Sequence, residues 1–198
     1  IANKYPDIIK EIFNDKNEIA CHYNFHDKVY KEDTSNFSKN LDLSIHYIEK
    51  AIGERPKGFR APNFSLKENN IAAFKELDKR FKYDSSLVTS KSKEDFENNN
   101  FLVNENIKIK EFFVYEMPIL NNFIKIKSGG TYLRVFSDKL IKNCMKHAHE
   151  LGHIPICYLH PYELENDSFW IKWNDLKFLK FKKKFFWWAR QYQWLKLG

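Results

Sequence analysis

Apolar and polar residues alternate along this chain with two different periods. Four segments place apolar side chains three or four positions apart, the spacing of one face of an α-helix. Pro6 suits the first turn of the first segment, and Ser65 with Glu68 forms a capping-box pattern at the third. Gly53 and Gly152 follow the second and the fourth, where helices commonly end. The pattern predicts helices over residues 6–16, 37–52, 65–81 and 137–151.

Short apolar runs between these segments predict β-strands. They are bounded by polar or glycine-rich stretches, and they cover residues 18–23, 58–60, 83–88, 107–118, 123–127 and 154–159. Residues 90–106 are rich in Asn, Lys, Glu and Ser, which is typical of a surface loop. The alternation of strand and helix predicts an α/β architecture, and a barrel is one arrangement compatible with it.

Length and charge narrow the class of protein. A chain of 198 residues is expected to form one domain with a single sizeable core. The formal net charge of +7 favours partners that carry phosphate or carboxylate groups. The basic residues are dispersed, however, and neither zinc-finger spacing nor an RNA-binding aromatic motif occurs, so a nucleic-acid partner is not expected.

The cysteines and the chain start bear on the compartment. Cys21, Cys144 and Cys157 are odd in number and lie in apolar sequence, so we expect reduced core thiols and a cytoplasmic protein. No uninterrupted apolar stretch is long enough to cross a bilayer. The sequence opens at Ile1 directly before a helical pattern, and we expect the natural N-terminus to lie upstream.

Several polar residues fall at or just beyond the ends of predicted strands: His22, His26, Arg60 and His160. In α/β folds the carboxyl ends of parallel strands meet at the edge where catalytic groups converge. Two imidazoles four residues apart can bind one face of a zinc ion, although such a pair is equally often structural. Arg60 before Pro62 can orient a carboxylate, or lie exposed on a turn. A histidine after an apolar strand is either packed or, like His160, available as a general acid.

Together these residues resemble the polysaccharide deacetylase family, also called the NodB homology domain or carbohydrate esterase family four. The run from Glu18 to His26 is similar to the metal-binding motif of that family, and residues 60–64 are similar to its Arg-x-Pro-x-Phe motif. Residues 159–161 resemble its late motif, which supplies a catalytic histidine. Residues 83–86, 128–134 and 160–163 resemble a subgroup found in bacterial surface-glycan gene clusters.

The resemblance implies a fold and a mechanism. The expected fold is a distorted (β/α) barrel whose first strands are missing from this chain. His22 and His26 would hold a divalent metal, most plausibly zinc, that activates water for attack on an N-acetyl group. Arg60 would position the catalytic base, and His160 would protonate the departing amine. The base and a third metal ligand, both aspartates in the family, would lie before Ile1.

Other residues are candidates for supporting roles. Asp84 would orient His160, or else be an ordinary turn residue. The resemblance also implies substrate contacts from five residues: Pro62, Phe64, Gly129, Gly130 and Tyr132. For the two glycines, a plain tight turn is the alternative. His147, His149 and His153 are interpreted as surface or packing residues instead of a metal cluster.

The C-terminal segment has its own composition. We expect residues 1–170 to form the catalytic part, and residues 171–198 to form a basic, aromatic helix. That helix would pack on the barrel or contact anionic lipid at a membrane surface, which would suit a lipid-linked glycan. The expected substrate is thus an N-acetylated amino sugar of a bacterial glycan. The alternatives are hydrolysis of a small linear amide on the same scaffold, and glycan binding by an inactive relative. The oligomeric state and the sugar do not follow from the sequence.

Overall fold

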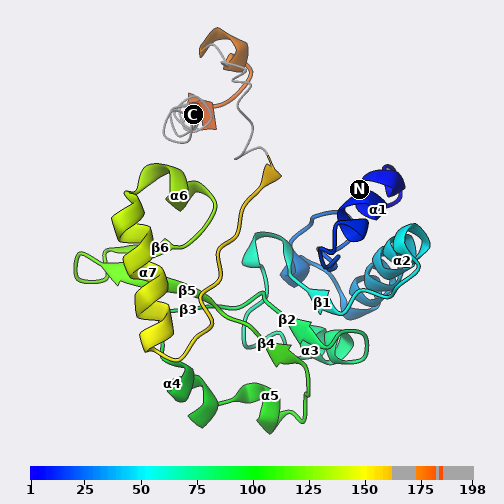
Figure 1. The fold of residues 1–198 in the computed structure, drawn as a ribbon, viewed down its shortest axis with the longest axis horizontal. Helices are drawn as coiled ribbons and strands as arrows, with labels where there is room; N and C mark the ends of the chain where they lie inside the picture. The colour runs from blue at the N-terminus through cyan, green and yellow to red at the C-terminus, as the bar shows by residue number, and fades with distance from the viewer. Residues whose placement is uncertain (162–172, 182, 185–198) are drawn as a thin grey trace. The chain divides into compact units, whose positions relative to one another are not determined.

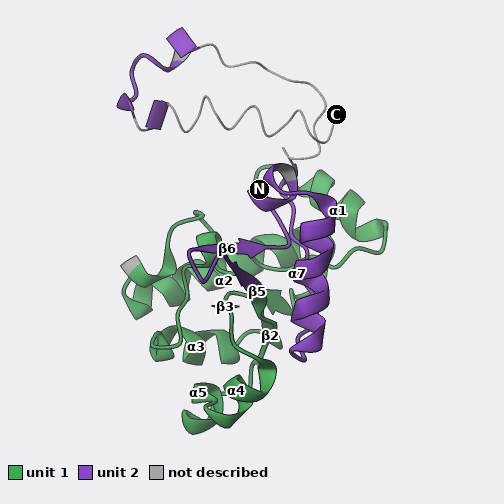
Figure 2. Cartoon of the chain, turned by 90° about the vertical axis from the view of Figure 1, so that its left-hand side faces the viewer, with its two compact units in different colours: residues 1–114 green, residues 115–198 purple. Residues whose placement is uncertain are grey.

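The chain divides into two compact units, residues 1–114 and residues 115–198 (Figure 2). The computed structural model describes residues 1–161, 173–181 and 183–184. Within these residues no helix has the length and apolar character needed to cross a membrane. Most of the expected C-terminal helix over 171–198 lies outside the described residues, so that prediction and the boundary at 170 stay untested.

The first unit contains most of the helices (Figure 1). Its helical elements are α1 (Pro6–Asn14), η1 (Val29–Lys31), α2 (Thr34–Ile52), η2 (Pro62–Phe64), α3 (Ile71–Asp78), α4 (Lys93–Asn98) and α5 (Phe101–Asn104). The predicted helices at α1 and α2 are confirmed. At the start of α2 the Asp33 side chain accepts the N–H of Asn36, and at its end Gly53 adopts a left-handed φ of 77°.

Three short parallel strands form the sheet of the first unit. They are β1 (Gly58–Phe59), β2 (Tyr83–Asp84) and β4 (Lys110–Glu111), in the order β1-β2-β4. An isolated parallel bridge between Cys21 and Phe59 extends this arrangement on the far side of β1. The strands of the described residues form no closed barrel, so the α/β class is confirmed and the distorted barrel with missing first strands is not.

The core of the first unit lies between α2, α3 and the sheet. Its largest fully buried side chains include Phe37 and Leu41 of α2, Phe59 of β1, and Phe74 and Leu77 of α3. The apolar stripe that predicted α2 is the face that packs here. This packing fixes the directions of the strands and therefore where each strand end projects.

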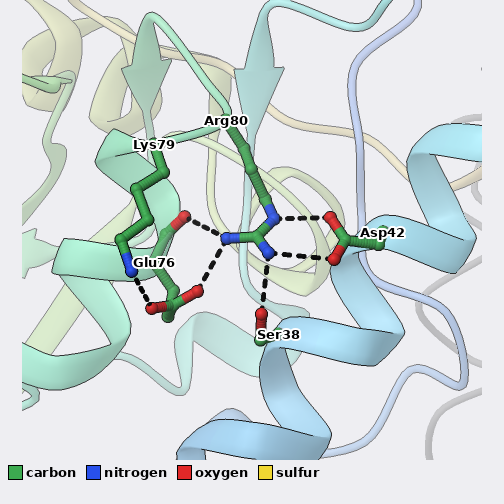
Figure 3. Close-up of polar contacts among 5 residues, drawn as sticks. All are labelled: Ser38, Asp42, Glu76, Lys79 and Arg80. Carbon is green, nitrogen blue, oxygen red and sulfur yellow. Dashed lines mark hydrogen bonds and ion pairs between the residues drawn. The ribbon is translucent and has the colours of Figure 1, made fainter.

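A polar network joins α2 to the end of α3 (Figure 3). The guanidinium of Arg80 donates to both carboxylate oxygens of Asp42, at 2.7 and 2.9 Å, and to Oε2 of Glu76 at 2.7 Å. It also donates to the hydroxyl of Ser38 at 2.7 Å, while Lys79 bonds the other oxygen of Glu76. Since only 12% of the Arg80 side chain is exposed, this bridge is partly shielded from solvent.

Two predicted segments of the first unit are wrong. The helix expected from Ser65 begins only at Ile71, because the Ser65 hydroxyl accepts the N–H of Val29 instead of capping a helix. Residues 90–106, expected as a loop, contain α4 and α5. Ser92 and Asp95 form a capping box at α4, and residues 100–104 bury Leu102. The polar residues that suggested a loop are exposed where they lie in these two short helices.

The second unit is built on an antiparallel hairpin and a helix. Its elements are β5 (Val114–Ile119), β6 (Ile124–Lys127), α6 (Thr131–Val135), α7 (Asp138–Glu150) and η4 (Trp173–Leu176), while β3 (Val88–Thr89) precedes them in the first unit. The strands pair from Glu116↔Lys127 to Ile119↔Ile124. The expected helix at 137–151 is confirmed, with Ser137 as its N-cap.

The second unit has its own core, and two of its segments differ from the sequence prediction. Tyr115, Ile126, Cys144 and Ala148 are buried between the hairpin and α7. The apolar run at 154–159 does not form a strand: only Tyr158 bridges, to Gly129. Short α6 was not expected either.

The cysteines are reduced, but they are not all in the core. Cys21 and Cys144 are buried, whereas Cys157 is exposed, which corrects the expectation of three core thiols. Burial raises the pKa of Cys21 to about 11, and burial also raises the pKa of Cys144.

Candidate active site

Three of the predicted site residues gather at one edge of the parallel sheet. His22 follows the Cys21 bridge, Arg60 follows β1, and Asp84 ends β2. Backbone hydrogen bonds fix this edge: the Cys21 N–H donates to the Gly58 carbonyl at 2.9 Å, and the Arg60 N–H donates to the Cys21 carbonyl at 3.0 Å. The parallel register therefore brings side chains that are far apart in sequence to the same end of the sheet.

The hydrogen bond made by His22 determines which of its nitrogens faces outward. Its Nδ1 lies 2.7 Å from the carbonyl oxygen of Arg60. A carbonyl oxygen only accepts, so Nδ1 must carry the proton in this contact. In the neutral ring Nε2 then holds the lone pair, which is the tautomer that a metal-binding imidazole needs.

The ring of His26 lies beside that of His22. The two ring centroids are 5.1 Å apart, with the planes at 70°, and both side chains are exposed. Tyr23 (φ 66°) and His26 (φ 59°) have left-handed backbone conformations, which turn the chain in the loop that carries the two histidines. Non-glycine residues with such φ values are uncommon and gather at functional sites.

Tyr23 anchors this loop to the core. Its side chain is 8% exposed, packs on Phe37 at a centroid distance of 5.4 Å, and donates its hydroxyl to Glu32. Burial, together with the hydrogen bond to Glu32, raises the pKa of Tyr23 far above its ordinary value. The hydroxyl therefore stays protonated, and the anchor persists at physiological pH.

A cavity of about 280 Å³ adjoins the two histidines within the first unit. Its lining is mostly apolar and includes Ile9, Ile19 and Ile48, with His22 and His26 at one side. The imidazoles thus border a recess instead of a flat surface.

Arg60 is held by Ser85 at the end of β2. Its Nε donates to the Ser85 carbonyl at 3.0 Å, and its Nη2 donates to the Ser85 hydroxyl at 2.8 Å. The guanidinium also lies over the ring of Phe64, 5.9 Å from its centroid. Pro62 is buried, while Asn63 and Phe64 have positive φ values of 55° and 50°. The second motif is therefore a compact, strained turn that fixes Arg60.

Asp84 is fully buried, which its sequence context did not indicate. It is a strand residue with 0% exposure, and its Oδ1 accepts the Ser86 hydroxyl at 2.6 Å. Its carboxyl lies within hydrogen-bonding reach of Glu111, its register partner on β4. Its expected pairing with His160 stays a prediction, because the two residues belong to different units.

Sequence reasoning missed Glu111. Its Oε1 accepts the N–H groups of Ser86 at 3.1 Å and Leu87 at 2.9 Å. The available signal was a single carboxylate in the run Lys110–Val114, between Ile109 and an apolar stretch. An acidic residue at that position of a buried strand needs partners.

The remaining predicted residues lie in the second unit. His160 is exposed, two residues after the bridge at Tyr158, and its ring meets that of Tyr158 edge-on at 6.3 Å. Tyr158 also fills the space over the two glycines: a Cβ built on Gly129 would lie 2.3 Å from its ring. The Gly130 N–H donates to the Tyr158 carbonyl at 2.8 Å. A substrate role for Gly129 and Gly130 stays a prediction.

The side chains of Tyr132, His147 and His153 make packing contacts. Tyr132 stacks on Phe136 and lies under the ammonium of Lys127. His147 hydrogen-bonds the Tyr115 hydroxyl through Nδ1 at 2.7 Å, and buried His153 stacks on the same tyrosine ring. The packing interpretation of these two histidines is confirmed.

Two of the described residues, His22 and His26, are candidate metal ligands. Nε2 of His22, which holds the lone pair because Nδ1 is protonated, and the neighbouring ring of His26 fit two ligands of a divalent ion. No group of three or more His, Cys, Asp or Glu side chains that could hold a metal occurs among the described residues. The expectation of aspartates upstream of Ile1 stays a prediction.

Sequence profiles place the chain in a family. Residues 1–81, which contain both histidines and Arg60, match the profile of the family Polysaccharide deacetylase. Residues 1–81 thus belong to the polysaccharide deacetylase family. Residues 85–195, more than half of the chain, match and belong to DUF3473, a domain of unknown function. A comparison with curated proteins found no match.

Solved structures were compared with the chain, and one of them reaches a TM-score of 0.50. A protein of Mycobacterium smegmatis described as a polysaccharide deacetylase is 19% identical, with a TM-score of 0.50 over 80% of this chain and 53% of its own. A family 4 carbohydrate esterase of Streptomyces lividans, solved with acetate, is 16% identical over 58% of each chain, with a TM-score of 0.40. A family 4 pseudoenzyme of Bacillus anthracis is 11% identical over 79% and 50%, with a TM-score of 0.39. The chain thus spans little more than half the length of the first two structures.

Proposed function

We propose that this chain is part of a metal-dependent deacetylase that removes N-acetyl groups from an amino sugar of a bacterial polysaccharide or lipid-linked glycan. One observation carries the proposal: His22, its tautomer set by the Arg60 carbonyl, lies beside His26 at the carboxyl end of a parallel sheet. Family membership supports the same chemistry. The substrate, its bacterial origin and the carrier lipid rest on the resemblance of residues 83–86, 128–134 and 160–163.

In this proposal each residue of the chain has a distinct task. His22 and His26 would hold a divalent ion, and zinc is proposed because it binds imidazole ligands well. When bound, such an ion supplies Lewis-acid activation of water and of the acetamide carbonyl. Arg60, fixed by Ser85, would keep the catalytic base in place and ionised. His160 would give its proton to the departing amine, so that acetate and a free amino sugar leave.

The substrate contacts and surroundings remain part of the proposal. Pro62, Phe64, Gly129, Gly130 and Tyr132 would line the sugar site. An orienting role of Asp84 on His160, expected from the sequence, would require the Asp84 carboxyl to leave the contacts that bury it in the first unit. A cytoplasmic location with peripheral membrane contact would suit a lipid-linked substrate, and the +7 charge supports attraction to an anionic surface.

Metal content tests the proposal directly. We expect the purified protein, carrying its full natural chain, to bind close to one zinc or other divalent ion. The His22→Ala, His26→Ala double variant should lose that metal and release no acetate from an N-acetylated oligosaccharide. His149→Ala is the matched control, because His149 is an exposed histidine of α7 whose loss should leave the metal in place.

Two results would redirect the assignment. Negligible metal in the wild type after incubation with zinc would remove the mechanism and favour an inactive glycan-binding relative. Full metal content with turnover of small linear amides, but not of acetylated sugars, would favour the amide hydrolase instead.

A further inference from the structure

Asp84 and Glu111 place two carboxyl groups side by side in the interior of the first unit. They are register partners at the ends of the adjacent parallel strands β2 and β4. Oδ2 of Asp84 and Oε2 of Glu111 are both buried, and no donor among the described residues reaches either atom. Neither carboxyl forms an ion pair with another described residue.

The other two oxygens of the pair are fully engaged. Oδ1 of Asp84 accepts the hydroxyl of Ser86, and Oε1 of Glu111 accepts the N–H groups of Ser86 and Leu87. These three donors fix how each carboxyl is turned. Oδ2 of Asp84 and Oε2 of Glu111 are therefore the oxygens left without a donor on two register-paired residues of adjacent strands.

Two ionised carboxylates in contact away from water repel strongly, whereas a single proton between them converts the contact into a hydrogen bond. We propose that Asp84 and Glu111 share one proton, and that the pair positions Ser85 and Arg60 at the edge of the proposed active site. The second half of this inference rests on the proposed function; the first half does not.

The titration of both groups agrees with the geometry. Burial raises the pKa of Asp84, and burial followed by repulsion from Asp84 raises the pKa of Glu111 well above its ordinary value. Both shifts favour the protonated form of a carboxyl in this pair.

Hydrogen bonds carry the effect of the pair to Arg60. Ser85 lies between Asp84 and Ser86, the residue that both carboxyls bind. Its hydroxyl donates to the carbonyl of Phe112, next to Glu111 on the chain, at 2.8 Å. Ser85 in turn accepts two N–H groups of Arg60, and the Ser86 hydroxyl accepts the Ala61 N–H at 2.7 Å. Both strand ends and the turn after Arg60 therefore depend on the pair.

Amide substitutions distinguish a shared proton from an accidental contact. In Glu111→Gln the oxygen still accepts from Ser86 and Leu87, so the NH₂ group points at Asp84 and replaces the proton. In Asp84→Asn the oxygen still accepts from Ser86, so the NH₂ group of the new asparagine points at Glu111. Each single variant should melt within about 2 °C of the wild type. The double variant turns two donors toward each other, and should melt about 6 °C or more below the wild type.

The pH dependence of melting gives a second measurement. A carboxyl whose pKa is raised in the folded state stabilises the protein at low pH, and this stabilisation is lost as the pH rises through the folded-state pKa. The melting temperature of the wild type should therefore fall toward alkaline pH more steeply than that of Glu111→Gln. Arg60, Tyr83 and Lys110, the titratable neighbours on β1, β2 and β4 or at their ends, are unchanged in the variant, so the difference between the two curves isolates the pair. Additive melting shifts, or identical pH curves, would overturn the shared proton.

The positioning role has its own readout. With acetate release as the assay, Glu111→Ala should lower kcat at least tenfold with a smaller change in KM, and Glu111→Gln should restore kcat to within about threefold of the wild type. Equal losses in both variants would overturn the positioning role. If the wild type proves inactive, the melting experiments still decide the shared proton, so failure of the proposed function and failure of this inference remain distinguishable.

Discussion

At the scale of single residues, the two motifs of the first unit are held in unfavourable backbone conformations. Tyr23, His26, Asn63 and Phe64 all have positive φ, which costs a non-glycine residue about 1–2 kcal/mol. Surrounding contacts must offset this cost, and the burial of Tyr23 with its bond to Glu32 is one of them. Contacts within the fold therefore help to hold the backbone around the imidazoles.

A glycine of the second unit gives a prediction at the same scale. Gly129→Ala should destabilise the protein by about 1–3 kcal/mol, because the new methyl group would overlap the ring and the carbonyl oxygen of Tyr158. The loss should appear as a lower melting temperature. Gly53→Ala is the comparison: a Cβ built on Gly53 meets no neighbouring atom within 4 Å, so the only cost should be the strain of an alanine at this left-handed φ, about 1 kcal/mol. A Gly129→Ala melt equal to that of the wild type would contradict the contact.

At the scale of elements, the bridge between α2 and α3 depends on one arginine. Arg80→Met should lower stability by about 1–2 kcal/mol, because Glu76, whose side chain is only 13% exposed, would lose its guanidinium partner. Lys75→Met is the control, since the ion pair of Lys75 with Glu105 is about half exposed and should contribute little. Denaturant unfolding of the three proteins measures both effects, and equal losses would contradict the role of burial.

The same bridge should have a defined pH dependence. The hydrogen bond from Arg80 lowers the pKa of Asp42, and that from Lys79, followed by Arg80, lowers the pKa of Glu76. A carboxyl whose pKa is lowered in the folded state stabilises the protein at pH values above the ordinary pKa, and this stabilisation is lost as the pH falls. The stability difference between wild type and Arg80→Met should therefore shrink as the pH falls below 4.5 and 3.8, the ordinary values of the two groups.

Which elements the sequence predicts depends on how local their determinants are. Helix α2 follows from its own residues, because the apolar stripe and Gly53 all act within the helix. The start of α3 does not, because Ser65 is engaged by Val29, 36 positions away. The role of Glu111 cannot be predicted from the sequence for the same reason: its carboxylate accepts N–H groups from a loop about 25 positions upstream. His22 and Arg60 were found because each directly follows an apolar run.

At the scale of the whole molecule, two units replace the single domain expected from chain length. The proposed metal ligands, Arg60 and the carboxyl pair all belong to the first unit, while His160 belongs to the second. Length and composition carry no information on that division, because each unit has an ordinary apolar core. The family profiles divide the chain too, at residues 81–85, before the unit boundary at 114.

The uneven burial of the three thiols gives the second unit a natural attachment point for a probe. Thiolates react with maleimides, and Cys21 and Cys144 are kept protonated by burial, whereas Cys157 is exposed. Native protein should therefore take up one maleimide per chain, and unfolded protein three. A spin label at Cys157, three positions before His160, would report the distance from this segment of the second unit to a second label placed on the first unit.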